Sequence, residues 1–208
     1  MQVTIVIPNY NGKHFMKPCL ESLDKQTYKG FEIIVVDNAS SDGSMEYMRD
    51  TYPEIRCIAL DKNYGFSRAV NEGIRASRTP YVILLNNDTT VDPRYVEEMV
   101  RAIRKSKRIF SVSSKMIQMY HPELIDSAGD LYTLMGWGVC RGTGRPVSNY
   151  TRSSQPAQEP PSTAAPPSRR SDTLTNPTSP TWRTLMWATG QRFTAIRTCT
   201  VPLPLSTM

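Results

Sequence analysis

Two acidic residues follow apolar runs, at or near the point where a strand would end, and could take part in chemistry. Asp37 follows FEIIVV and opens the stretch DNASSDGS, and Asp88 ends VILLNND. An aspartate at such a position often only caps a turn. Its carboxylate can also accept hydrogen bonds from a nucleobase or a ribose, or bind Mg²⁺ or Mn²⁺, which prefer hard oxygen ligands. We take Asp37 as the candidate base or ribose contact. We take Asp88 as the candidate ligand of a cation that neutralises a leaving diphosphate.

A third stretch, NYGFSRAVN at positions 63–71, has a glycine just before a predicted helix. Gly65 lets the backbone approach a ligand closely, the helix N-terminus favours an anion, and Arg68 could pair with phosphate. Taken alone, the stretch fits an ordinary loop-to-helix junction with a surface arginine better than a ligand site. The two histidines, His14 and His121, have no serine or cysteine partner that the sequence places beside them, and we interpret both as non-catalytic.

The elements that must position these residues alternate between strands and helices. Apolar, β-branched runs predict strands at Val3–Ile7, Phe31–Val36, Ile55–Leu60, Tyr81–Leu85 and, less clearly, Phe110–Ile117. Helical spacing of apolar residues predicts helices at Phe15–Leu23, Ser44–Arg49, Ser67–Ser77 and Pro93–Lys105. This alternation predicts an α/β fold, with a mostly parallel sheet and helices on both faces.

Polar residues cluster where three of the predicted strands end. They occupy Asn9–Asn11, Asp37–Asp42 and Asn86–Asp88. The carboxyl ends of parallel strands share one edge of the sheet, where ligands bind in open α/β folds. We therefore expect the three clusters to meet in one crevice, which is stronger evidence for a site than any one of them.

The composition of the chain changes near Tyr150. All ten tyrosines lie at or before that residue, whereas residues 151–208 hold nine of the sixteen prolines, no lysine and only two acids. Six tail arginines supply most of the net charge of +6, so the first 150 residues are nearly balanced, and we expect no nucleic-acid binding. We predict an incomplete ligand-binding domain over 1–150, followed by a Pro/Ser/Thr-rich tail over 151–208 that is irregular, disordered or translated out of frame.

The four cysteines show no spacing typical of zinc sites, and no apolar run at the N-terminus is long enough for a signal peptide or a membrane span. We expect a cytoplasmic protein, with at most peripheral association at the inner face of the membrane.

Five motifs in order resemble a known family. TIVIPNYNG, FEIIVVDNASSDGS, NYGFSRAVNEGI, YVILLNNDTTVDP and SSKMIQ…IDSAGDLY are similar to family 2 glycosyltransferases of the GT-A fold, with the nearest likeness to bacterial rhamnosyltransferase-like members. The resemblance covers residues 1–150. It implies inverting transfer of a sugar from a nucleotide-sugar donor, such as a UDP- or dTDP-sugar, to a glycan or lipid-linked acceptor, with Mg²⁺ or Mn²⁺ as cofactor.

The resemblance also implies a site. Pro8, Asn9 and Tyr10 would line the nucleotide pocket, Asp37 would contact the base, and Asp88 would be the one clear metal ligand, because the family's D-x-D motif here reads N-N-D. The full set of expected nucleotide-sugar-binding residues is Pro8, Asn9, Tyr10, Asn11, Asp37, Asn38, Gly65, Arg68, Asn87 and Asp88.

Inverting transfer needs a general base, usually a carboxylate. In the family it comes from a later E-D or D-x-D element, and nothing in residues 151–208 matches that element. The genetic code offers an explanation. Shifted by one base, the codons of Met186-Trp187-Ala188 are forced to read Val-Gly, and permitted third bases let Trp182–Ala188 and its neighbours encode L-E-D-V-D-V-G. We infer a frame change near Arg152 or Ser153. A natural Pro/Ser/Thr-rich tail is the alternative.

Two other functions remain open. The chain could be a non-catalytic nucleotide-sugar-binding fragment or the product of a pseudogene. A nucleotidyltransferase shares a nucleotide-binding parallel sheet, but it needs a Gly-rich basic loop after the first strand, which PNYNGKH does not supply.

Overall fold

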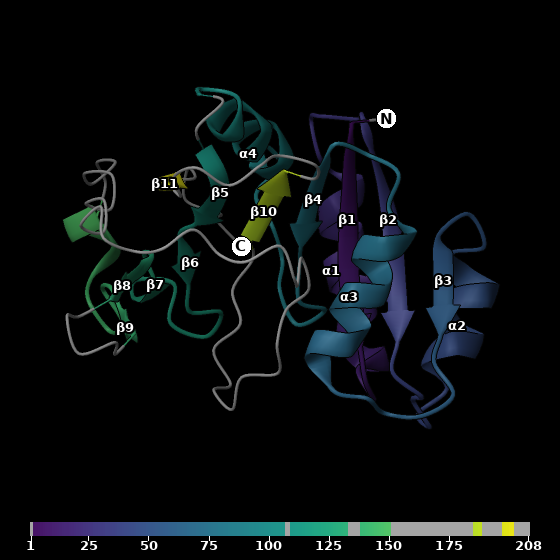
Figure 1. Cartoon of the computed structure of the whole chain (residues 1–208). Helices are drawn as coiled ribbons and strands as arrows, with labels where there is room; N and C mark the ends of the chain where they lie inside the picture. Colours follow the sequence, from purple (N-terminus) through teal and green to yellow (C-terminus); the bar gives the residue numbers. More distant parts are fainter. Residues whose placement is uncertain (1, 107–108, 133–137, 151–184, 189–196, 202–208) are drawn as a thin grey trace.

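The fold is seen in a computed structural model, which describes residues 2–106, 109–132, 138–150, 185–188 and 197–201. A central sheet carries helices on both sides, and a smaller group of short strands lies beyond β5 (Figure 1). In the ranges described, no helix is both long and apolar enough to cross a membrane.

The chain alternates strands and helices up to residue 114. The strands are β1 (Val3–Asn9), β2 (Phe31–Asp37), β3 (Arg56–Ala59), β4 (Tyr81–Leu84), β5 (Ile109–Ser114), β6 (Met116–Ile117), β7 (Ile125–Ser127), β8 (Asp130–Tyr132), β9 (Gly138–Cys140), β10 (Leu185–Ala188) and β11 (Arg197–Val201). The helices are α1 (Lys13–Asp24), α2 (Ser44–Thr51), α3 (Phe66–Ala76) and α4 (Tyr95–Ile103), with a 3₁₀ turn η1 at Val147–Tyr150.

The main sheet has the order β11-β5-β10-β4-β1-β2-β3. The four strands β4, β1, β2 and β3 pair in parallel, which confirms the predicted parallel sheet. The predicted elements agree with the observed ones to within a few residues. α1 begins at Lys13, two residues before the predicted start, so Pro18 lies inside the helix rather than near its first turn.

Alternate side chains of β1 enter two separate cores, as the period of two in a strand requires. Val3, Ile5 and Ile7 pack into a core shared with α1 and α4. Val6 packs into the second core, against Ala69 and Val70 of α3. Helices therefore cover both faces of the sheet, as predicted, and the carboxyl ends of the strands stay open at one edge.

Two segments of the tail differ from the expected irregular structure. β10 lies between β4 and β5 and runs antiparallel to both, and β11 pairs in parallel with β5. In the ranges described, β4 and β5 join the same sheet only through β10. Because unpaired strand edges leave backbone hydrogen-bonding groups unsatisfied, a short segment that fills such a gap gains pairing on both sides. The other tail residues, with the inferred frame change near Arg152 or Ser153, lie outside the described residues.

A smaller unit follows β5. β6 pairs with β7 and β8 pairs with β9, both antiparallel. Ile125, Ala128 and Val147 form its small core.

Gly73 provides a test of the packing between α3 and the sheet. A Cβ atom built there would collide with Cγ1 of Val6 and approach Cγ2 of Val36 at 3.2 Å. We predict that Gly73→Ala lowers the free energy of unfolding by about 1–3 kcal/mol, as overpacking does. Chemical denaturation measures this. Val6→Ala in the same chain removes the obstructing methyl groups and should relieve part of that cost. Purely additive effects of the two substitutions would contradict the packing described here.

Candidate active site

The open edge is organised around Asn9, the last residue of β1. Asn9 pairs with Asp37 in the sheet register, and its Nδ2 donates to Asp37 Oδ1 at 2.7 Å. Its Oδ1 accepts a hydrogen bond from Asn87 Nδ2, also at 2.7 Å. Asn9 and Asp37 are both only 2% exposed. One buried amide therefore joins the ends of β1, β2 and β4.

The loop after β2 satisfies Asp37 from within the protein. Ser40 donates to its carboxylate twice, from its backbone N–H at 2.9 Å and from its hydroxyl at 2.6 Å. The same hydroxyl accepts a bond from the backbone N–H of Asn11, whose own side chain accepts from the N–H of Ser41. Asn11 has φ of 51°, which asparagine tolerates better than most residues. Asn11 thus connects the loop after β1 to the loop after β2. It is not among the residues that line the pocket described below.

Asp42 connects the same loop to α1. Its carboxylate accepts bonds from the backbone N–H of Lys13 and from the N–H and hydroxyl of Ser44. Burial of Asp42 acts to raise its pKa, but these hydrogen bonds to the ionised form outweigh burial and lower the pKa.

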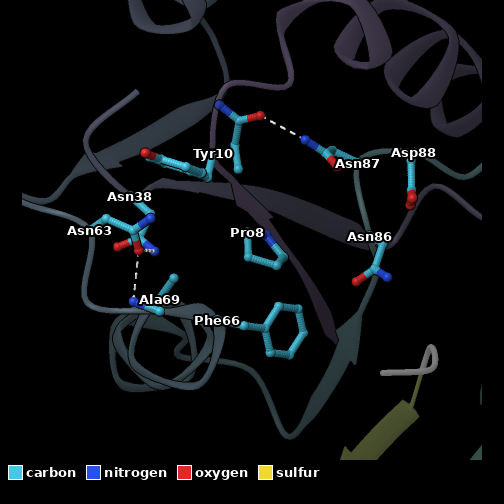
Figure 2. Close-up of a pocket in the computed structure, with 11 residues that line it drawn as sticks. Pro8, Tyr10, Asn38, Asn63, Phe66, Ala69, Asn86, Asn87 and Asp88 are labelled. Carbon is cyan, nitrogen blue, oxygen red and sulfur yellow. Dashed lines mark hydrogen bonds between the residues drawn. The ribbon is translucent and has the colours of Figure 1, made fainter. Parts of the chain in front are cut away.

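A pocket of about 380 Å³ opens at this edge (Figure 2). It is lined by polar side chains from the ends of β1, β2 and β4 and by the start of α3. The lining residues are Pro8, Asn9, Tyr10, Asn38, Asn63, Gly65, Phe66, Ala69, Asn86, Asn87 and Asp88. Five of them are asparagines, whose amides both donate and accept, and Asp88 is the one formally charged residue in that lining. The pocket is therefore suited to a ligand with many hydrogen-bonding groups.

Asn38 and Asn63 hold the loop that forms one wall. Asn38 Nδ2 donates to Asn63 Oδ1 at 2.7 Å, and Asn38 Oδ1 accepts from the backbone N–H of Tyr64. Asn63 Oδ1 also accepts from the N–H of Gly65. Gly65 has φ of 84° and ψ of 168°, a region that essentially only glycine occupies, and no atom lies within 4 Å of where its Cβ would be. Backbone conformation, not space, requires glycine here.

Cys19 of α1 contacts the backbone of the turn that carries Asn86. It is fully buried, and its thiol donates to the backbone carbonyl of Asn86. Burial raises the pKa of this thiol to about 12, and the negative charge of Asp88 adds to the rise. Cys19 therefore stays protonated at neutral pH and supports the backbone before Asp88.

The structure brings most of the expected site residues together at the pocket. Pro8, Asn9, Tyr10, Asn38, Gly65, Asn87 and Asp88 line it. Three others lie outside the lining. Asn11 ties the loops as described above, and the carboxylate of Asp37 is used by Asn9 and Ser40. Arg68 forms an exposed ion pair with Glu72 at 2.8 Å, and its guanidinium lies 5.9 Å from the ring centre of Tyr64.

Four lining residues were not among the expected site residues. Asn63, Phe66 and Ala69 belong to NYGFSRAVN, and Asn86 begins the N-N-D triplet. The sequence singled out both stretches, but nothing in its spacing shows which side chain of a loop or of a first helical turn faces the cavity. Neither His14 nor His121 lines the pocket.

Comparison with known proteins identifies the family. The sequence model described as "Glycosyl transferase family 2" matches residues 4–125, which contain the whole pocket. The chain belongs to this family.

Curated relatives are bacterial glycosyltransferases. "Glycosyltransferase GlyA" of Streptococcus pneumoniae is 32% identical over 104 residues, which are 49% of this chain and 15% of that protein. An uncharacterised glycosyltransferase of Haemophilus influenzae is 27% identical over 131 residues, which are 63% of this chain and 42% of that protein. The match thus spans less than half the length of these relatives.

Solved structures confirm the GT-A fold. A mannosyltransferase from Pyrobaculum calidifontis in complex with GDP-Man and Mn²⁺ matches with a TM-score of 0.51 at 23% identity, over 55% of this chain and 35% of that chain. Residues 1–349 of Staphylococcus aureus TarS in complex with UDP match with a TM-score of 0.52 at 18% identity, over 66% of this chain and 43% of that chain. At this identity the likeness shows the fold.

Gly12 provides a test of the amide network in this family 2 domain. A Cβ atom there would collide with Asn87 Nδ2 and lie 2.7 Å from Asn9 Oδ1. We predict that Gly12→Ala costs about 1–3 kcal/mol of folding stability, because buried hydrogen-bonded groups would have to move. Lys17→Ala, on an exposed turn of α1, is the control and should stay within about 0.5 kcal/mol of the parent chain. Equal effects in the two variants, measured by chemical denaturation, would contradict the network.

Proposed function

We propose that residues 1–150 bind a nucleotide-sugar donor, such as a UDP- or dTDP-sugar, and that the fold serves inverting transfer of the sugar to a glycan or lipid-linked acceptor. A rhamnosyltransferase-like role in bacterial polysaccharide assembly fits the motifs. Family membership and the amide-lined pocket support donor binding. Two proteins of similar fold bind nucleotide sugars in their solved structures: the Pyrobaculum calidifontis mannosyltransferase binds GDP-Man, and Staphylococcus aureus TarS binds UDP-GlcNAc.

The charge of the pocket is the observation that carries the proposal. Asp88 contributes the one formal charge of the lining, and that charge is negative. A diphosphate placed there would meet no lysine or arginine among the lining residues, so its binding requires a cation. Mg²⁺ is commonly held by one or two carboxylates together with substrate phosphates, and Mn²⁺ accepts the same oxygen ligands.

The residues present fit such a cation. Asp88 offers a carboxylate, and the amides of Asn86 and Asn87 on the same turn carry oxygen atoms (Figure 2). In the part of the chain described, no group of three or more His, Cys, Asp or Glu side chains could hold a metal ion, so substrate oxygens would have to complete the site. Bound there, a divalent cation would stabilise the charge that develops on the leaving diphosphate.

The chain's own residues have separate tasks in this proposal. The amides of Asn38 and Asn63 shape the wall that holds the base and ribose. Tyr10, which is 52% exposed at the rim, offers an aromatic face for stacking. The ends of β1 and β4 hold the diphosphate near Asp88. No residue of the pocket is assigned as the base that activates the acceptor.

Asp88→Asn tests the donor site. The substitution keeps the shape and removes the charge, so we predict that Mn²⁺ no longer strengthens UDP or dTDP binding and that affinity in Mn²⁺ falls at least about tenfold, as loss of a metal ligand implies. Isothermal titration calorimetry measures this. Asp50→Asn, on the exposed side of α2, is the matched control and should bind like the parent chain. Unchanged Mn²⁺-dependent binding by the Asp88 variant would refute the proposal.

We further propose that this chain transfers sugar poorly or not at all, because residues 151–208 are translated out of frame. The composition break at Tyr150 supports this, as do the forced Val-Gly codons at Met186-Trp187-Ala188. On this account Trp182–Ala188 occupies the codons of an acidic element that held the general base. A non-catalytic nucleotide-sugar-binding protein is the second candidate, favoured by the same missing base.

Sequencing the coding DNA tests the frame proposal. We predict third bases in codons 181–188 that spell L-E-D-V-D-V-G one frame over, and we predict donor turnover from a chain whose frame is restored near codon 152. Third bases incompatible with that string would overturn the frame change. Robust transfer by the 208-residue chain itself would overturn the expected impairment.

A further inference from the structure

We propose that Asp37 is a positioning residue: acting through Asn9, it sets the orientation of the Asn87 amide so that an oxygen atom, and not an NH₂ group, is presented beside Asp88. The inference rests on the proposed metal-assisted donor site and gives Asp37 a task in addition to the base contact expected from the sequence. Its basis is a chain of two hydrogen bonds, Asn87 Nδ2 to Asn9 Oδ1 and Asn9 Nδ2 to Asp37 Oδ1, each 2.7 Å long.

The direction of this chain is fixed at one end. A carboxylate can only accept hydrogen bonds, whereas each amide has one accepting and one donating side. Asn9 must therefore turn its Nδ2 toward Asp37, which turns its Oδ1 toward Asn87. Asn87 must therefore donate from its Nδ2, so its own oxygen lies on the side away from Asn9. The carboxylate of Asp37 thus determines, through Asn9, which end of the Asn87 amide faces Asn9 and which end faces away.

The surroundings prevent the amides from turning freely. Asn9 and Asp37 are 2% exposed, so solvent cannot substitute for a lost bond. Ser40 adds a second constraint, because its hydroxyl accepts from Asn9 Nδ2 at 3.1 Å and donates to Asp37 Oδ1. Gly12 leaves room for the Asn9–Asn87 contact that any larger residue would fill.

The consequence reaches the pocket. Asn87 lines the pocket and immediately precedes Asp88. In Figure 2, the dashed line from the nitrogen of Asn87 marks its hydrogen bond to Asn9 Oδ1. An amide oxygen there adds a second hard ligand for a hydrated Mn²⁺ ion or for the water molecules that surround it. An NH₂ group in the same place would repel the cation. Residues that orient a metal ligand by hydrogen bonding, without touching the metal, commonly have a large effect on metal affinity.

Asp37→Asn is the first test. The backbone N–H of Ser40 keeps the new side-chain oxygen at the position of Asp37 Oδ2. The new NH₂ then faces Asn9 and favours the reversed chain, in which Asn87 turns its NH₂ to the cation. We predict Mn²⁺ binding about 10- to 100-fold weaker in the presence of UDP, with Asn87 and Asp88 unchanged. Electron paramagnetic resonance of free Mn²⁺ reports this affinity.

Asn87→Asp supplies the decisive second variant. In the parent chain its carboxylate would face Asn9 Oδ1, acceptor against acceptor, and lower the melting temperature. Combined with Asp37→Asn, the reversed Asn9 donates to the new carboxylate. We therefore predict that the double variant melts above either single variant and recovers most of the lost Mn²⁺ affinity. Such non-additive coupling is expected only between groups that share a network.

Asp42→Asn is the matched control. Asp42 lies in the same loop and also accepts backbone hydrogen bonds, but it contacts neither Asn9 nor Asn87. Its combination with Asn87→Asp should be additive. Additive melting temperatures for Asp37→Asn with Asn87→Asp would overturn the inference, because a residue that only contacts the base cannot be rescued at position 87. If the parent chain binds no Mn²⁺ with UDP, the proposed function fails, while the melting temperatures still decide the amide chain.

Discussion

The hydrogen bonds centred on Asn9 are the constraint on which the rest of the site depends. Parallel strands end with polar backbone at one edge of a sheet, and side chains must fix that edge before it can hold a ligand. Asn9 does so from within, since its single amide joins Asp37 after β2 to Asn87 after β4. This buried connection fixes the side of the pocket formed by the ends of β1, β2 and β4, whereas Asn38 and Asn63 hold the wall before α3.

The chemistry of the pocket follows from what its lining contains. Amides of five asparagines offer hydrogen bonds of both kinds, and Asp88 adds one negative charge. Neutral amides can recognise a base and ribose, but they cannot balance a diphosphate. The proposed need for a cation follows from this lining, and membership of glycosyltransferase family 2 is consistent with a nucleotide diphosphate as the ligand.

The alternation of apolar runs predicted the parallel sheet, the helices on both faces and the meeting of three polar clusters at one edge. These features depend on local periodicity and on the geometry of parallel strands, which sequence patterns carry directly. The sequence did not show that the Asp37 carboxylate accepts three hydrogen bonds from Asn9 and Ser40, because hydrogen-bond partners depend on loop conformation. It also did not show that Asn63 and Phe66 line the pocket, or that β10 enters the sheet antiparallel between β4 and β5. Those features arise from contacts between distant segments.

The most direct test compares uridine with UDP, and thymidine with dTDP, in calorimetric titrations with and without Mn²⁺. We predict that Mn²⁺ leaves nucleoside binding unchanged and strengthens diphosphate binding at least about tenfold, since only the diphosphate needs its charge balanced beside Asp88. Equal affinity for the diphosphates with and without the metal would contradict a donor site that depends on a cation.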